Sequence, residues 1–224
     1  MFLAPVLAMG LALPLPALAD GPARTITVTG EGHVSLPPDM ATVTIGVRED
    51  ADSAAEALRR MSAGLAPVLD ELAAAGVAAA DIQTSGLSLG ARYTYPDNEQ
   101  PQLVGYTASS TVTVRLRDIA QVGAVLDAVV GEGANGISGI SFGLADPAAA
   151  TDAARRAAVA DAQARAALYA EAAGVVPGAV LSISESGAMA PMPVAYAMRD
   201  AGSVPLAAGE VEVTASVTMV LAIE

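Results

Sequence analysis

The sequence contains no cysteine and no lysine, and His33 is its single histidine. Without cysteine the chain can form no disulfide, no thiol nucleophile and no thiolate metal site. Without lysine it has no side-chain amine for Schiff-base or lysine-nucleophile chemistry. One histidine alone is a weak metal site, because protein metal sites draw on several ligands. We therefore expect no enzymatic activity and no cofactor.

Basic side chains are also scarce. Eleven arginines face 24 aspartates and glutamates, which gives a formal net charge of -13. Nucleic-acid binding needs clustered positive charge along the phosphate backbone. The chain offers only three close basic pairs, which are Arg59-Arg60, Arg115 with Arg117, and Arg155-Arg156. This balance argues against nucleic acid as a partner, and it also repels anionic lipid surfaces.

The first residues have the pattern of an export signal. Residues 2–19 carry no charge and end in Ala17-Leu18-Ala19, the small-x-small pattern that a signal peptidase accepts. No Lys or Arg precedes the apolar run, which is unusual for a signal peptide. Three prolines interrupt that run and leave it too short to span the bilayer as a regular helix. We predict a signal peptide over residues 1–19 and an exported, periplasmic mature chain without a transmembrane segment.

Hydrophobic periodicity predicts the elements of the mature chain in the order β-β-α-β-β-α-β-α-β-β. The second strand is expected to run antiparallel to the first. Hairpins outnumber β-α-β crossovers, so we predict an α+β fold with a mostly antiparallel sheet and helices packed on one face. No long linker divides residues 20–224, which indicates a single domain. The expected strands are 25–29, 41–47, 87–95, 106–116, 140–144, 180–185 and 211–223, and the expected helices are 53–76, 118–130 and 146–174.

Small residues mark two places in this pattern. In the alanine-rich third helix, a small face should allow the helix backbone to lie close to a sheet. We expect Gly30 and Gly32, beside the first strand, to adopt backbone conformations closed to other residues. The predicted small face consists of Ala150, Ala154, Ala157, Ala164 and Leu168.

Two glycine motifs resemble known functional patterns. Gly131-x-Gly133-x-x-Gly136 has the spacing of a dinucleotide-binding loop. That loop works only after a strand and before a helix N-terminus, whereas here a helix is predicted before it and a strand after it. We therefore interpret the motif as a turn and not as a nucleotide site.

Gly86-x-Ser88-x-Gly90 has the spacing of a nucleophile elbow, in which serine lies on a sharp turn between a strand and a helix. Ser88 is instead predicted inside an alternating strand, and His33 is the only histidine that could serve as its base. A periplasmic serine hydrolase that uses Ser88 and His33 is thus an alternative hypothesis. The preferred interpretation is a serine in a strand.

The segment from Gly187 to Gly209 is rich in methionine and proline and has only Arg199 and Asp200 as charges. Connections this long are uncommon in compact domains and are often functional. Exposed apolar side chains in such a segment favour an interaction surface, so we predict a homo-oligomeric interface there. Two alternatives are that the segment folds back over its own sheet or that its thioethers carry copper or another small molecule. The predicted interface residues are Met189, Met192, Tyr196, Met198 and Leu206.

Five short blocks follow one another in a fixed order: Ile26-Thr-Val-Thr-Gly-Glu-Gly32, Pro38-Asp-Met-Ala41, Asp81-Ile-Gln-Thr84, Gly105-Tyr106 and Ala172-Ala-Gly174. With them the chain resembles the SIMPL-domain family from about residue 24 to residue 224. The resemblance implies an exported bacterial protein of the periplasm or of the outer-membrane fraction, with some relatives linked to stress defence and no established catalytic residues. The chain is therefore expected to be a non-catalytic structural or binding module of the cell envelope, with itself and an envelope protein as partners.

The export signal gives the first testable prediction. We expect the mature protein to begin at Asp20, because Ala17 and Ala19 present the small side chains that the peptidase requires. N-terminal sequencing of protein recovered from the periplasm measures this directly. Periplasmic protein that still begins at Met1 would show that the segment is not cleaved.

Overall fold

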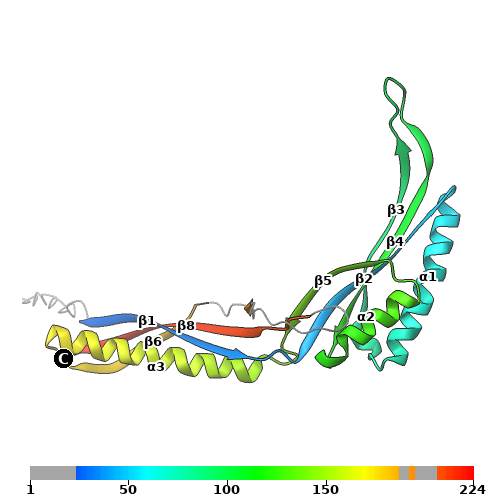
Figure 1. The fold of residues 1–224 in the computed structure, drawn as a ribbon. Helices are drawn as coiled ribbons and strands as arrows, with labels where there is room; N and C mark the ends of the chain where they lie inside the picture. Colours follow the sequence, from blue (N-terminus) through cyan, green and yellow to red (C-terminus); the bar gives the residue numbers. More distant parts are fainter. Residues whose placement is uncertain (1–23, 187–191, 195–205) are drawn as a thin grey trace, which may run out of the picture.

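The computed structural model describes residues 24–186, 192–194 and 206–224. Its α+β class and its order of longer elements confirm the sequence prediction, and the short strand β7 and two 3-10 turns are additional (Figure 1). The strands are β1 (Thr25–Leu36), β2 (Met40–Ala51), β3 (Ile82–Thr94), β4 (Gln102–Leu116), β5 (Gly136–Gly143), β6 (Pro177–Glu185), β7 (Met192–Val194) and β8 (Glu210–Ile223). The helices are α1 (Ala54–Ala74), η1 (Ala79–Asp81), η2 (Ile119–Gln121), α2 (Val122–Gly131) and α3 (Ala148–Ala173).

The described strands form two antiparallel sheets and not one. The terminal sheet holds the first and last strands in the order β1-β8-β6, and β7 also pairs with β8. The middle sheet has the order β3-β4-β2-β5. Figure 1 shows the two sheets lying end to end in an elongated, bent molecule. That residues 20–224 form one domain stays a prediction.

The expectation that the first two strands are antiparallel neighbours is wrong. Strand β1 pairs along its length with β8, whereas β2 lies between β4 and β5. Only residues 37–39 connect β1 to β2, and two of them are prolines. Proline fixes its backbone φ angle and has no N–H to donate to a neighbouring strand. The two prolines therefore interrupt strand pairing at the point where the chain passes from the terminal sheet into the middle sheet.

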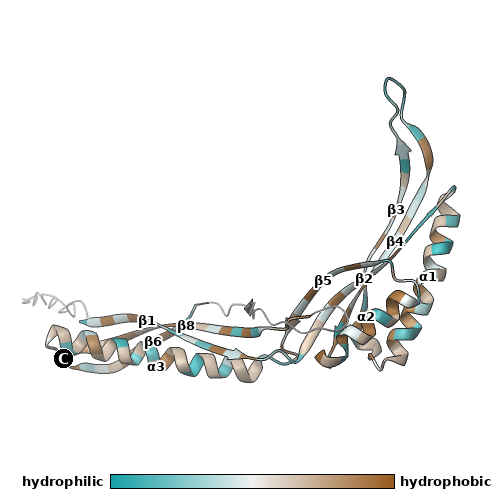
Figure 2. Ribbon diagram, in the orientation of Figure 1, coloured by the Kyte–Doolittle hydropathy of each residue, from teal (hydrophilic) through white to brown (hydrophobic). Residues whose placement is uncertain are grey.

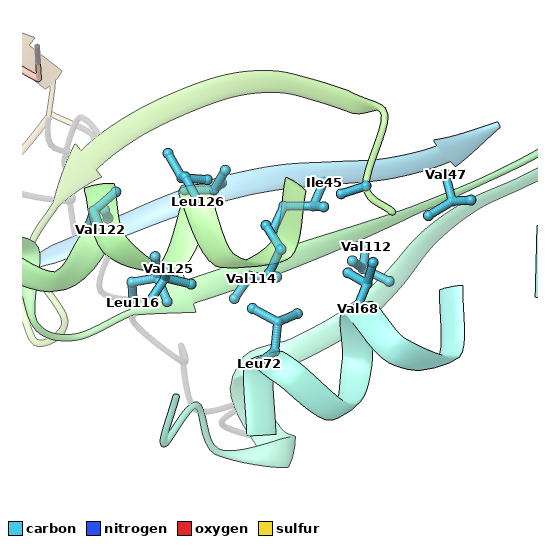
Figure 3. Packing of buried hydrophobic residues seen from close by; sticks show 14 of the residues in the cluster. Ile45, Val47, Val68, Leu72, Val112, Val114, Leu116, Val122, Val125 and Leu126 are labelled. Atoms are coloured by element: carbon cyan, nitrogen blue, oxygen red, sulfur yellow. The ribbon is translucent and has the colours of Figure 1, made fainter. Parts of the chain in front are cut away.

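Helices α1 and α2 cover one face of the middle sheet with large apolar side chains. Alternate residues of β2 and β4, such as Ile45 and Val112, point into the same core as Leu72 of α1 and Leu126 of α2 (Figure 3). Helix α1 begins where Ser53 accepts the N–H of Glu56 at 3.3 Å, as the capping motif predicted. It continues through Pro67 without ending there.

Helix α3 covers the terminal sheet through a much closer contact. A Cβ placed on Gly30 would lie 2.2 Å from the carbonyl oxygen of Ala158, and one on Gly32 would lie 2.0 Å from that of Ala154. The helix backbone therefore rests directly on β1. Neither glycine has a positive φ, so the expectation of an unusual backbone conformation is wrong. These positions need glycine for space and not for conformation.

The buried face of α3 repeats every four residues, which corrects part of the predicted small face. Ala150 and Ala154 are buried as expected, whereas Ala157, Ala164 and Leu168 are exposed. A helix has 3.6 residues per turn, so a strict four-residue stripe winds gradually around its surface. Such a stripe follows a twisted sheet, and sequence periodicity alone does not show it. The buried alanines are Ala150, Ala154, Ala158, Ala162, Ala166 and Ala170.

An aspartate on α3 also protects the edge of the terminal sheet. Asp161 Oδ2 accepts the backbone N–H of Glu31 at 2.8 Å. This bond lowers the pKa of the Asp161 carboxyl below its ordinary value, and Arg165 contributes in the same direction. An exposed edge strand offers unpaired donors to other chains, and this carboxylate occupies one of them.

An ion pair joins η1 to the end of β4. Arg117 donates from Nε to Asp81 Oδ2 at 2.7 Å and from Nη2 to Oδ1 at 2.9 Å. The Asp81 side chain is only 7% exposed. These two hydrogen bonds lower the pKa of Asp81, and the charges of Arg117 and Arg115 add to the effect. The pair therefore holds the connection between α1 and β3 against the sheet.

We expect Gly32→Ala to lower the free energy of unfolding by about 1–3 kcal/mol, because the added methyl group overpacks a tight contact. Gly90→Ala is the matched control, since a Cβ at that strand glycine meets no atom within 4 Å. Chemical denaturation of both variants measures the difference. Equal stability of the two would mean that α3 does not press on β1 as described.

Arg117→Gln should lower the melting temperature at pH 7 and leave it unchanged in strong acid. The fold lowers the Asp81 pKa, so the stabilisation is present above the unfolded pKa of about 3.9 and is lost as the pH falls through the folded pKa. Thermal unfolding over a series of pH values from 7 downward tests this, because the deficit of the variant should shrink as the pH falls. Arg156→Gln serves as control, because Arg156 forms no ion pair within the described residues. A deficit that stays the same over the whole series would contradict the prediction.

Candidate functional site

The two residues of the hydrolase hypothesis lie in different sheets. Ser88 is on β3 of the middle sheet, where its Oγ lies 3.1 Å from Ser109 Oγ. His33 is on β1 of the terminal sheet, where its Nδ1 lies 3.0 Å from Glu212 Oε1. Ser88 also lies inside a strand and not at a strand-to-helix turn. The structure therefore does not bring the proposed nucleophile and base together.

The glycine motif at residues 131–136 lies between a helix and a strand. Helix α2 ends at Gly131 and β5 begins at Gly136. This is the reverse of the strand-to-helix order that holds a pyrophosphate. The interpretation as a turn is confirmed, and Gly133, with a φ of 113°, is its left-handed residue.

The predicted interface residues fall mostly outside the described part of the chain. Met189, Tyr196 and Met198 lie outside it, and Met192 begins β7, which pairs with β8. Leu206 is described and is half-buried against the core of the middle sheet, although β6 and β8, the strands that flank the segment, belong to the terminal sheet. The assignment of the segment to an interface stays a prediction, as does the copper alternative. Among the described residues no cluster of His, Asp and Glu is arranged to hold a metal ion.

Both sheets leave apolar side chains exposed on an edge strand. In the middle sheet α1 packs mainly on β2 and β4, so Leu87 and Leu89 on β3 remain 66% and 48% exposed. In the terminal sheet α3 packs on β1 and β8, so Val180 and Ile183 on β6 remain 44% and 56% exposed. We call these the β3 patch and the β6 patch. Sequence alternation placed Leu87 and Leu89 on one face of their strand but could not show how far α1 reaches across the sheet. Val180 and Ile183 share a face only because the register shifts between Val180 and Ser182, which alternation does not predict.

The hairpin of β3 and β4 extends beyond the rest of the middle sheet (Figure 1). Its strands carry hydrophobic stretches along this extension (Figure 2), and Tyr93, Tyr95, Leu103 and Val104 are exposed there. The chain has only five tyrosines. The hairpin therefore continues the β3 patch to the extremity of the molecule.

A polar cluster fixes the base of this hairpin. Asp50, near the end of β2, accepts hydrogen bonds from Thr107 Oγ1 on β4 and from Arg92 on β3. The hydrogen bond from Thr107 is the main cause that lowers the pKa of Asp50, and the charges of Arg92 and Arg48 also lower it. Next to this cluster, Gly105 has a φ of 145°. A Cβ there would lie 2.8 Å from the carbonyl oxygen of Ala51, so only glycine fits.

The face of the middle sheet that α1 and α2 leave uncovered carries polar side chains and a hollow of about 390 Å³. Gly46 and Gly136 form its floor, because they pair with each other across β2 and β5. Arg48, Ser109 and Asn135 are among the side chains that line it. Nothing in the sequence patterns indicated this hollow, since it depends on which strands become neighbours.

Within the described residues, no helix has the length and hydrophobicity needed to cross a membrane.

Comparison with known proteins places these features in a family. The family model of SIMPL, described as "Protein of unknown function (DUF541)", matches residues 26–221. The chain is 38% identical to the "26 kDa periplasmic immunogenic protein" of Brucella melitensis over 231 residues, which cover 95% of this chain and 92% of that protein. It is 31% identical to the "Uncharacterized protein YggE" of Edwardsiella ictaluri over 175 residues, 78% of this chain and 72% of that protein.

The YggE protein of Escherichia coli K12 is 35% identical over 150 residues, 67% of this chain and 60% of that protein. The family match begins in β1 and ends in β8, so it includes both sheets and all three α-helices. It confirms the resemblance seen in the short sequence blocks. The chain belongs to the SIMPL family.

Proposed function

We propose that this protein is a non-catalytic module of the bacterial periplasm that associates with further copies of itself. The periplasmic location is supported by the printed name of the Brucella relative and by the apolar, uncharged segment at residues 2–19. An outer-membrane association and a link to stress defence are the context that the family resemblance implies. The non-catalytic role is supported by the separation of Ser88 from His33 in two sheets.

The observation that carries self-association is the exposure of apolar side chains on the two edge strands. Contiguous exposed apolar surface marks interaction sites in soluble proteins. The β3 patch and the β6 patch each lie on an edge strand whose outer edge pairs with no other described strand. Such an edge can pair with another chain through its backbone. Each patch thus combines apolar burial with backbone hydrogen bonding.

Two different edges favour a head-to-tail contact between copies. When the β3 patch of one copy meets the β6 patch of the next, each copy still has one patch free. The contact can therefore repeat, and it closes into a ring when the rotation between copies allows. The predicted interface in residues 187–209 lies between β6 and β8 in the sequence. It would extend the contact made by the β6 patch.

Leu87→Thr combined with Leu89→Thr tests this proposal. Threonine suits a strand, so the variant should fold, and it should shift the protein from an oligomer toward the mass of one mature chain. Light scattering behind size-exclusion chromatography measures the mass. Leu168→Gln is the matched control, because Leu168 is similarly exposed but lies on the outer face of α3.

Two results would contradict the self-association proposal. One is a monomeric wild type at micromolar concentrations, and the other is a double variant with the mass of the wild type. Since the hydrolase alternative predicts covalent labelling by a fluorophosphonate, the same preparations can be tested with that probe, and labelling that is lost in Ser88→Ala would contradict the non-catalytic role.

A further inference from the structure

The hollow on the uncovered face of the middle sheet lies over three neighbouring strands. In register across the sheet, Gly86 of β3 pairs with Thr111 of β4, Thr111 pairs with Gly46 of β2, and Gly46 pairs with Gly136 of β5. The hollow itself involves β4, β2 and the start of β5. Thr111 is the only side chain in this row that rises above the backbone.

The fold does not require glycine at the floor of this hollow. Neither Gly46 nor Gly136 has a positive φ. A Cβ on Gly46 would approach no atom closer than 3.4 Å, and one on Gly136 none closer than 3.7 Å. Gly32, by contrast, is required because α3 lies on it. Glycine inside a strand weakens the strand and often marks a place where another group approaches closely.

The charges around the hollow leave one guanidinium without an internal partner. Asp50 lines the hollow, but Arg92 and Thr107 already bind its carboxylate. Arg48 lines the same hollow and forms no ion pair with any carboxylate among the described residues. Because Arg92 and Thr107 bind Asp50, the Arg48 guanidinium remains available to an anionic ligand, on a chain whose formal net charge is -13.

Asn135 holds Arg48 in place from the adjacent turn. Its Oδ1 accepts the Arg48 backbone N–H at 2.9 Å, and its Nδ2 donates to the Arg48 carbonyl at 2.8 Å. Each amide atom keeps capacity for one more hydrogen bond. Beside Arg48, the hydroxyl of Ser109 lies 3.1 Å from that of Ser88, and either hydroxyl can also bond to a ligand. The lining thus offers one cation together with several hydroxyl and amide groups.

We propose that this hollow binds a small carboxylate that also carries several hydroxyl groups, such as a uronic acid unit. Arginine forms paired, charge-assisted hydrogen bonds with a carboxylate. The hydroxyls of Ser109 and Thr111 and the amide of Asn135 suit the hydroxyl groups of such a ligand. The volume of the hollow, about 390 Å³, lies within the range of small-molecule sites. The site does not depend on self-association, because it lies on the face opposite to the β3 patch.

Isothermal titration of the purified protein with sodium glucuronate tests the site, with glucose and acetate as comparison ligands. Glucuronate carries both the carboxylate and the hydroxyl groups, so it should bind at least tenfold more tightly than either comparison ligand. Arg48→Gln should weaken glucuronate binding at least tenfold. Gly46→Val should abolish it, because the side chain fills the hollow, while the melting temperature stays at or above that of the wild type.

Gly90→Val is the matched control, since Gly90 pairs with Thr107 opposite Asp50 on the same face and lies outside the lining. It should bind glucuronate as the wild type does. The proposal is overturned if the wild type shows no binding, if glucose or acetate binds as tightly as glucuronate, or if a folded Gly46→Val variant still binds. Should Gly46→Val fail to fold, undiminished binding by Arg48→Gln, whose side chain is exposed, would overturn it equally.

Discussion

The contact between α3 and the two glycines of β1 is the constraint on which the terminal sheet depends. With carbonyl oxygens of the helix lying where a Cβ would stand, no side chain larger than hydrogen fits at Gly30 or Gly32. The helix in turn presents only alanines on its buried face. Stability here comes from close backbone approach and from the valines and methionine of β8, such as Val213 and Met219, and not from large interlocking side chains.

The middle sheet is packed with large side chains, unlike the contact of α3 with β1. Leucine, isoleucine and valine fill its core, yet α1 is one helix wide and the sheet has four strands. In both sheets helices cover neighbouring strands, β2 and β4 in the middle sheet and β1 and β8 in the terminal sheet, and leave an edge strand with apolar residues in water. The β3 patch and the β6 patch are thus products of the same geometry, and association between copies would remove both from solvent.

Local features of this fold could be predicted from the sequence, whereas the pairing of strands could not. Ser53 and Gly174 mark helix ends because capping depends on a few neighbouring residues, and the alternation of β8 shows its buried face. Pairing is different, because the alternation of β1 suits either β2 or β8 as a neighbour. The hollow around Arg48 could not be predicted for the same reason. Its floor is formed by Gly46 and Gly136, which pair across two strands, and no local sequence pattern relates those two residues. The distance between Ser88 and His33 likewise became clear only when their strands were assigned to separate sheets.

The pairing of β1 with β8 also has a consequence for the order in which the chain can fold. Thr29 and Thr218 face each other across the terminal sheet although 189 residues separate them in sequence. Closing so long a loop is entropically costly, and contacts of high sequence separation form slowly. The hairpin of β3 and β4 needs no such closure, so the middle sheet can form while the terminal sheet is still open. The strand that is synthesised first therefore remains without its partner until the fourteen residues of β8 have been made, and during that interval Gly30 and Gly32 have no β8 beside them.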